Sequence, residues 1–252
     1  MPAIAISAFV GAATLGGGVI GLFLQGFLPE KHTADRSRDM LAAIVGLISL
    51  LLALVLGTLI GSAYSFYATQ KTEMETLAAR SLQLDLSLAQ YGPEAAPLRS
   101  ALRNTLGGID ALIWGDGQAD PRQFKAAAVL PSLRGMVARF SSLTSASDTQ
   151  KELLSSIAAD EGQIQQTRLL ISLQLASPIS WPLFGVVASW SILLFCGFGI
   201  LSRINVTTLA ALTLGSFAIG SAIFLILELN EPYNGLFKIP RSAMQQAIEA
   251  LG

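Results

Sequence analysis

Four long runs of this chain contain no charged residue. They are residues 2–29, 40–70, 169–202 and 204–227. A helix needs roughly 20 apolar residues to cross a hydrocarbon core about 30 Å thick, and each run exceeds that length. A charged side chain at mid-bilayer costs roughly 2.5 to 3.5 kcal/mol on insertion scales, which accounts for the exclusion of charge. The pattern predicts four transmembrane helices.

The charged residues are confined to the segments between and after these runs. All 16 Lys and Arg and all 17 Asp and Glu lie there, at the density of an ordinary soluble protein. We therefore predict an all-α integral membrane protein with a soluble helical region between transmembrane helices 2 and 3. The expected parts are transmembrane helices 1 and 2 in residues 1–67, a soluble helical stalk in 68–180, a transmembrane hairpin in 181–229 and an amphipathic tail in 230–252.

The second transmembrane helix is expected to continue beyond the membrane. It begins near Met40, and no proline interrupts it before Pro93. Apolar residues recur along one face of the extension, at Met74, Leu77, Leu84 and Leu88. Tyr91-Gly92-Pro93 ends the helix, because glycine breaks a helix and proline is suited to the first turn of the next one.

Shorter helices are expected in the middle of the soluble region. A helix over residues 94–106 ends at Gly107-Gly108, and further short helices start near Pro121 and Pro131. A long helix then begins at Ser147-Asp148 and carries an apolar stripe at Leu153, Ile157, Ile164, Ile171 and Leu175. This helix returns towards the membrane antiparallel to the extension of the second helix, and we interpret the pair as a stalk.

The last two transmembrane helices form a hairpin. Ser177-Pro178 separates the stalk from the third span, in which Trp181 is placed for the membrane interface. Only residues 202–205 separate the third span from the fourth. Asn205 is suited to cap the fourth span.

Small residues line one side of several spans. In the first span Gly17 and Gly21 form a pair that lets helices approach closely in lipid. In the second span the small residues are Gly46, Ser49, Ala53, Gly57 and Gly61. Two interpretations stay open for this second set: helix packing through Gly57 and Gly61, or a pore-lining face, and both can hold in an oligomer. The fourth span has its own small set, Ala211, Gly215, Ala218 and Ala222.

The tail holds a compact candidate motif just after the fourth span. Its members are Glu228, Asn230, Glu231, Pro232, Tyr233 and Gly235. A carboxylate this close to the hydrocarbon has usually either a partner or a function. Glu228 and Glu231 could form a cation-attracting ring at the mouth of an oligomer, or pair with Arg203, Lys238 or Arg241. A final amphipathic helix carries Met244, Ile248 and Leu251 on one side.

Catalysis and nucleic-acid binding find little support in the composition. The chain has 52% hydrophobic and 13% charged residues and a net charge of −1, with a mean hydropathy of +0.57 and a pI near 5.8. One His and one Cys, with Cys196 at membrane depth, leave no catalytic or zinc-binding set. His32 near Glu30 and Asp35 is more typical of a solvated turn than of a metal site. We therefore expect no enzyme activity, no cofactor, no metal and no nucleic-acid partner.

Several segments together resemble the bestrophin-like domain family of mostly bacterial membrane proteins. They are Leu28-Pro29 with His32, Leu77-Ala78-Ala79, Leu84-Asp85, residues 91–95, residues 222–228 and Pro232-Tyr233-Asn234-Gly235. Asn230 departs from the family pattern, in which Asp is common, so a role that needs a second carboxylate there is in doubt. The family name implies similarity to bestrophins, which are oligomeric anion channels.

Two functions are therefore compared. The spans hold no ionisable group away from their ends, which disfavours coupled transport. A channel needs no such group, but four helices require a homo-oligomer to enclose a pore. The alternative is a non-catalytic anchor that recruits partners through its stalk. The expected partners are the bilayer, further copies of the chain and small inorganic ions. The expected location is a bacterial inner membrane, with the amino terminus and the stalk in the cytoplasm.

Overall fold

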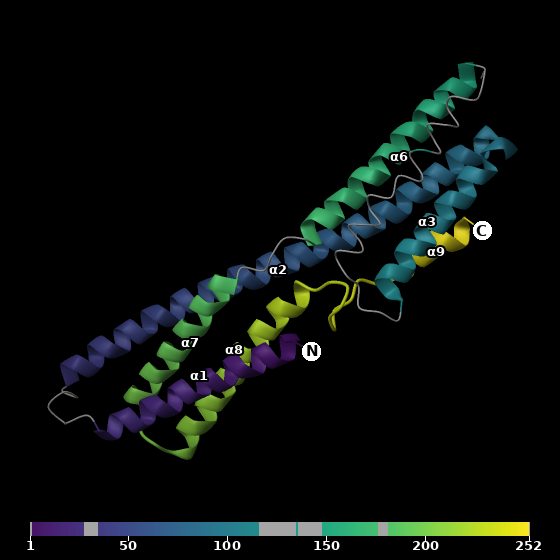
Figure 1. The fold of residues 1–252 in the computed structure, drawn as a ribbon. Helices are drawn as coiled ribbons and strands as arrows, with labels where there is room; N and C mark the ends of the chain where they lie inside the picture. The colour runs from purple at the N-terminus through teal and green to yellow at the C-terminus, as the bar shows by residue number, and fades with distance from the viewer. Residues whose placement is uncertain (1, 28–34, 116–134, 136–147, 176–180, 252) are drawn as a thin grey trace. The chain divides into compact units, whose positions relative to one another are not determined.

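The computed structural model describes residues 2–27, 35–115, 135, 148–175 and 181–251 (Figure 1). Its helices are α1 (Pro2–Phe27), α2 (Asp35–Tyr91), the short 3-10 helix η2 (Pro93–Ala95), α3 (Ala96–Trp114), α6 (Asp148–Leu175), α7 (Trp181–Leu201), α8 (Val206–Leu229) and α9 (Ser242–Ala250). The sequence-based expectations for residues 30–34, for Pro121, Pro131 and Ser147, and for Ser177-Pro178 fall outside the described residues.

Four of the described helices are long and apolar enough to cross a membrane. They lie at Ala3–Phe27, Arg38–Tyr91, Trp181–Leu201 and Val206–Leu229. The predicted all-helical membrane fold with four spans is confirmed. The predicted continuation of the second span is also confirmed, because α2 runs for 57 residues without a break.

The chain divides into two compact units. Unit 1 comprises Met1–Phe66 and Ile179–Asn230, and unit 2 comprises Tyr67–Pro178 and Glu231–Gly252. The chain passes between the units three times, at residues 66/67, 178/179 and 230/231. Unit 1 therefore holds α1, α7, α8 and the first half of α2, and unit 2 holds the second half of α2 with η2, α3, α6 and α9.

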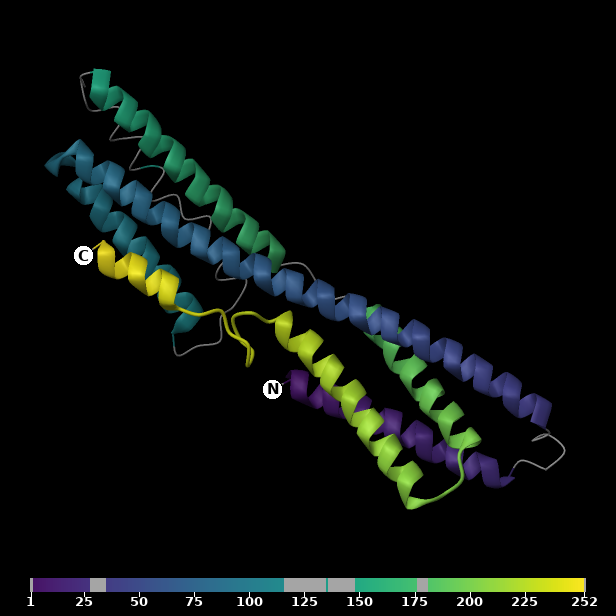
Figure 2. The ribbon, with the colours of Figure 1, turned by 180° about the vertical axis from the view of Figure 1, so that it is seen from behind.

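Glycines on α1 allow close helix packing in unit 1, where α1 lies beside α7 and α8 (Figures 1 and 2). A β-carbon placed on Gly17 would lie 2.7 Å from the carbonyl oxygen of Ile192 on α7, and one on Gly21 would overlap the backbone of Cys196. Since a backbone carbonyl cannot rotate away as a side chain can, neither position accepts a larger residue. The predicted role of the Gly17 and Gly21 pair is confirmed.

Half of the small set predicted to pack on α8 does so: a β-carbon on Gly215 would lie 2.8 Å from the ring of Phe195 on α7, and Ala222 is half-buried. Ala211 and Ala218 are exposed. A β-carbon on Gly220 would lie 3.2 Å from the carbonyl oxygen of Ser7, and the nearby Ser216 is buried. The spacing of small residues in the sequence suits two adjacent faces of this helix, so spacing alone could not select between them. The predicted cap is confirmed, because the Asn205 side chain accepts a hydrogen bond of 2.6 Å from the backbone N–H of Thr208.

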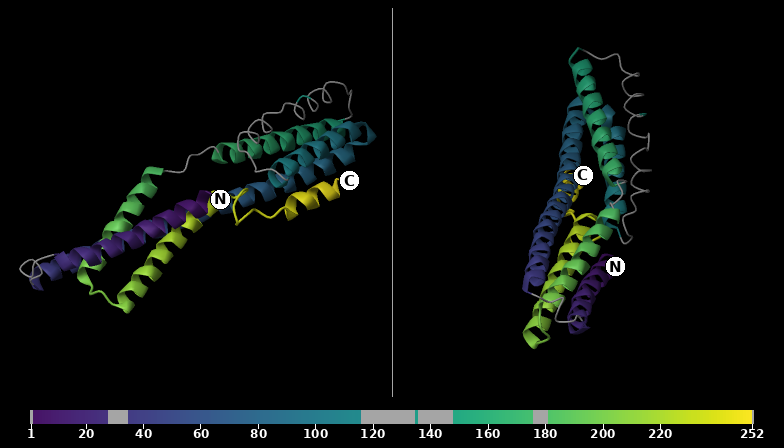
Figure 3. Two further views of the ribbon diagram at one scale, coloured as in Figure 1. Left: turned by 60° about the horizontal axis from the view of Figure 1, so that its bottom comes forward. Right: turned by 90° about the vertical axis from the view of Figure 1, so that its left-hand side faces the viewer.

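Unit 2 is built around the second half of α2 and an antiparallel α6. Gln70 near the start of this half bonds Gln174 near the end of α6, so the two helices run in opposite directions as predicted. The buried core contains leucines and isoleucines of α2, α3 and α6, including Leu77, Leu84, Leu88, Leu102, Leu106, Ile157, Ile164 and Ile171. α9 lies alongside α3 and adds Met244 to this core (Figure 3).

The predicted end of the first soluble helix was wrong. α3 starts at Ala96 and continues through Gly107 and Gly108 to Trp114. Glycine within a helix costs roughly 1 kcal/mol relative to alanine. Burial of Ile109 and Ile113 beyond the two glycines offsets that cost, because each buried side chain of this size contributes roughly 1.5 to 3 kcal/mol. Gly92, at φ 119°, does end α2 as predicted.

Candidate functional site

The membrane half of α2 buries only one narrow face in unit 1. Its buried side chains are Val45, Leu52, Leu56 and Ala63, which recur at spacings of seven and four and so share one side of the helix. Val45 packs against Gly197 of α7, where a β-carbon would clash with the valine. At the end of the same pair of helices, Arg38 Nη2 donates a hydrogen bond of 2.9 Å to the carbonyl oxygen of Leu201.

The small residues of α2 lie away from this buried face. Gly46, Ala53, Gly57 and Gly61 are exposed, while Ser49, at the edge of the face, is half-buried and donates to the carbonyl oxygen of Val45. A β-carbon at Gly46, Gly57 or Gly61 would meet no described atom within 4 Å. Within the described part of the chain, no helix packs against Gly57 or Gly61, so packing between subunits and a pore-lining face both stay open as interpretations.

Two hydroxyl-bearing residues of α2 were missed by the sequence-based selection. Thr58 and Ser62 are exposed one helical turn apart. The Thr58 hydroxyl donates a hydrogen bond of 2.8 Å to the carbonyl oxygen of Val55. In contrast, Thr14 of α1 and Ser191 of α7 are buried between helices. The sequence does place the two hydroxyls four residues apart within an otherwise apolar run, and this spacing could have identified them.

Glu228 lies in the last turn of α8 and is only 6% exposed. The predicted pairing with Arg203 is wrong, because Arg203 precedes the opposite end of α8, and a helix of 24 residues is roughly 36 Å long at 1.5 Å per residue. Of the other two predicted partners, Lys238 and Arg241, the arginine forms a two-pronged ion pair with Asp110, with Nε and Oδ1 2.7 Å apart.

The residues after Glu228 form a closed turn. The Asn230 side-chain amide donates to the carbonyl oxygen of Ile226 at 2.7 Å. The same carbonyl also accepts from the backbone N–H of Asn230 at 3.3 Å, so the amide adds a second bond at the end of the helix. A carboxylate could not donate this bond, so asparagine has a structural advantage over aspartate here.

Backbone hydrogen bonds hold the rest of this turn. The carbonyl oxygen of the exposed Glu231 accepts from the N–H of Gly235 at 3.0 Å, and that of the buried Pro232 accepts from the N–H of Ile239 at 2.9 Å. These contacts give Glu231, Pro232 and Gly235 a role in shaping the start of the tail.

Tyr233 joins the tail to α2 and α6 through two amides, the buried one of Gln70 and the half-buried one of Gln174. Its hydroxyl donates to Gln70 Oε1 at 3.0 Å, and Gln70 Nε2 donates to Gln174 Oε1. Burial raises the pKa of the Tyr233 hydroxyl well above its ordinary value, and the negative charge of Glu73 adds to the rise. The neutral, donating form of the tyrosine is therefore the stable one. Neither glutamine was selected from the sequence, since a lone amide gives no periodic signal.

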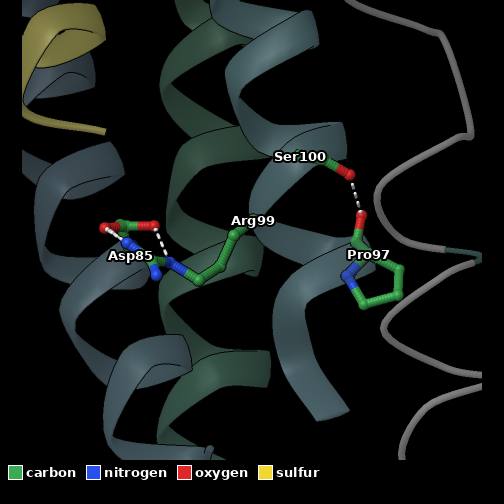
Figure 4. Close-up of polar contacts among 4 residues, drawn as sticks. All are labelled: Asp85, Pro97, Arg99 and Ser100. Carbon is green, nitrogen blue, oxygen red and sulfur yellow. Dashed lines mark hydrogen bonds and ion pairs between the residues drawn. The ribbon is translucent and has the colours of Figure 1, made fainter. Parts of the chain in front are cut away.

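Ion pairs hold α3 between its neighbours in unit 2. Arg99 of α3 binds both carboxylate oxygens of Asp85 on α2, at 2.6 and 2.8 Å (Figure 4). The same view shows Ser100 Oγ donating to the carbonyl oxygen of Pro97 within the first turn of α3. The hydrogen bond that each guanidinium donates to its partner carboxylate raises the pKa of Arg99 and of Arg241. The two pairs are therefore structural.

Charged groups are also buried along α6. Burial raises the pKa of Asp160, against the opposing effect of Arg80, and burial lowers the pKa of Arg168, against the opposing effect of Glu161. Groups of three or more His, Cys, Asp or Glu side chains able to hold a metal ion are absent from the described part of the chain. His32 lies outside that part.

The arrangement defines a class of protein: a helical membrane protein with four candidate spans, one of which continues into a soluble stalk. The sequence matches the Bestrophin-like domain over residues 12–244. The chain therefore belongs to the bestrophin-like domain family, and the resemblance noted in the sequence is confirmed.

Solved structures share this fold. A single-substitution variant of a bacterial bestrophin homologue from Klebsiella pneumoniae aligns with a TM-score of 0.69 and 14% identity, covering 100% of this chain and 97% of that chain. A second structure of a bestrophin homologue from the same organism aligns with a TM-score of 0.66 and 13% identity, over 97% and 96% of the two chains. Such low identity supports the common fold alone. No curated protein matches the sequence.

Proposed function

We propose that the chain forms a homo-oligomeric ion channel in which the small face of α2, defined as Gly46, Ser49, Ala53, Gly57 and Gly61, meets neighbouring subunits or the pore. The observation that carries this proposal is the open space around Gly46, Gly57 and Gly61. The glycines of α1, which also lie in a membrane span, are in contact with α7 and α8 at four positions, Gly11, Gly17, Gly18 and Gly21. On α1 only Gly16 and Gly26 meet no described atom within 4 Å, whereas on the membrane half of α2 all three glycines are open.

Lipid is a poor explanation for the open face of α2. Glycine costs roughly 1 kcal/mol relative to alanine in a helix interior, and a lipid-facing position gains nothing in return. Close packing between subunits, or room for ions along a symmetry axis, would compensate for the lower helix stability that glycine causes. The exposed hydroxyls of Thr58 and Ser62 are consistent with a surface in contact with water.

Anion selectivity is the finer part of the proposal and follows from the family resemblance. The low exposure of Glu228 disfavours a ring of carboxylates at the pore mouth, which would attract cations. Glu231, Tyr233 and Pro232 then serve the tail rather than the permeation path. For orientation we propose a cytoplasmic amino terminus and stalk.

The experiment is ion flux from liposomes that contain the purified protein. Gly57→Leu should reduce flux while the oligomer stays intact, because the added side chain enters the space at the small face. Gly185→Leu is the matched control, since Gly185 of α7 is exposed in the same unit and also meets no described atom within 4 Å. Wild-type liposomes that remain sealed around intact oligomers would contradict the channel and favour the membrane anchor.

A further inference from the structure

Exposed apolar side chains are unevenly distributed over unit 2. Its described residues include six large hydrophobic side chains that are exposed: Leu86, Leu169, Leu170, Leu173, Leu236 and Phe237. Five of these lie within ten residues of a point where the chain passes between the units, and only Leu86 does not. Large exposed apolar groups that gather at one place mark an interaction site more often than scattered ones do.

The three leucines of α6 belong to a charge-free run. Residues 169–202 hold no charge and continue into α7. Leu173 is 51% exposed, whereas its neighbour Ile171 is fully buried in the core of unit 2. The last turns of α6 therefore carry apolar residues on their outer side as well as on their inner side. A helix that is apolar all round is typical of a segment in contact with lipid.

The tail presents Leu236 and Phe237 outward because its backbone is fixed. The hydrogen bond from the N–H of Ile239 to the carbonyl oxygen of Pro232 closes the turn. Ile239 is buried beside it, while Leu236 is 76% exposed. Collapse of the two side chains onto the core would break that closed turn.

The tail is also tied to the membrane span by a short piece of chain. Leu236 follows the end of α8 at Leu229 by seven residues, which span at most about 25 Å when fully extended. Lys238, the next residue but one, is exposed. An apolar pair followed by a lysine suits the boundary of a bilayer, where the apolar groups enter the acyl region and the ammonium meets lipid phosphate.

The α6 and tail groups lie at the same end of unit 2. Gln70 bonds Gln174, close to the leucines of α6, and Tyr233, close to Leu236. We call the set Leu169, Leu170, Leu173, Leu236, Phe237 and Lys238 the base of unit 2. We propose that this base inserts into the headgroup region of the bilayer and holds unit 2 at an anionic lipid surface. This proposal does not depend on ion conduction.

The test uses spin labels on the full-length protein in vesicles of phosphatidylcholine and phosphatidylglycerol. Single cysteines are introduced by Phe237→Cys, Leu173→Cys and the matched control Leu86→Cys, each in a Cys196→Ser background. Leu86 is 64% exposed but distant in sequence from every crossing point. Collisions with oxygen, which concentrates in lipid, are compared with collisions with a water-soluble nickel complex.

At positions 237 and 173 we expect oxygen collisions to dominate, and at position 86 we expect nickel collisions to dominate. Labels at 237 and 173 that are as open to nickel as the label at 86 would overturn the proposal. Labels shielded from both reagents and broadened by spin–spin interaction would also overturn it, because they would place the base against a second copy of the chain. A folded protein with an unchanged elution volume is required of each variant before labelling.

Discussion

The two halves of α2 show how one helix is stabilised in two different environments. In unit 1 the large residues Leu47, Leu50 and Leu54 are exposed, whereas in unit 2 Leu77 and Leu84 are completely buried. Lipid is as apolar as leucine, so the membrane half gains little by burying it, and close backbone approach decides the packing instead. The half in unit 2 follows the hydrophobic effect in water. Substitutions that add side-chain volume should therefore destabilise unit 1 most, and substitutions that remove side-chain volume should destabilise unit 2 most.

The largest effect is expected from Gly21→Leu. The new side chain would overlap the backbone of Cys196, and this overlap should cost about 3 kcal/mol or more because the backbone cannot yield. We expect loss of the folded protein in thermal unfolding and size-exclusion measurements in detergent. Gly16→Leu is the control on the same helix, since Gly16 has no described neighbour within 4 Å. Equal stability of the two variants would contradict the sensitivity of unit 1 to added volume.

Lost volume in unit 2 should have the next largest effect. Leu84→Ala removes a fully buried side chain and should lower the free energy of unfolding by about 2 to 5 kcal/mol. Leu50→Ala, at a 72% exposed position of the membrane half, should change it by much less. Thermal unfolding of both variants checks the contrast. A similar loss of unfolding free energy in the two variants would mean that the hydrophobic effect stabilises the membrane half of α2 as well.

A smaller and pH-dependent effect is expected from Tyr233→Phe. Loss of the hydrogen bond to Gln70 should cost about 1 kcal/mol near neutral pH. The folded protein holds the Tyr233 pKa above its ordinary value of 10.0, so above pH 10 the unfolded chain loses a proton that the folded chain keeps. Stability of the wild type should therefore fall as pH rises above 10, and the variant should fall less. Parallel pH profiles of the two proteins would contradict this role.

The smallest effect is expected from Glu228→Gln. Glutamine keeps the size of the side chain and removes its charge, and the position is buried in the last turn of α8. We expect an unchanged reversal potential in planar-bilayer recordings, because we propose that this buried carboxylate lies away from the permeation path. A shifted reversal potential would contradict this expectation and support a carboxylate ring formed by Glu228 at the pore mouth. Glu231→Gln, at an exposed position, is the companion variant.

The sequence was sufficient to predict the spans and the stalk, because both leave a periodic or charge-free pattern. The cap at Asn205 also carries a local signal that the structure bears out. The course of α3 was missed because burial of Ile109 and Ile113 overrides the local preference of Gly107-Gly108. Local sequence cannot report such a tertiary effect.

The candidate site was less accessible to sequence-based prediction. The small stripe of α2 suits packing and pore lining equally well, and only its surroundings distinguish packing within the chain from contact outside it. The partner of Arg241 was likewise unpredictable, because Asp110 is 131 positions away. The link from Tyr233 through Gln70 to Gln174 joins three segments that have no common motif.

The central claim is that the small face of α2 meets water or another subunit, and thiol labelling tests it most directly. Gly57→Cys in a Cys196→Ser background is reconstituted in liposomes and exposed to a membrane-impermeant thiol reagent. We expect modification together with loss of ion flux, and Leu50→Cys on the same helix as the comparison that keeps its flux. Flux that persists unchanged in Gly57→Cys after complete modification would contradict the claim, because a thiol in the pore would block it when modified and a thiol packed against another subunit would not be modified.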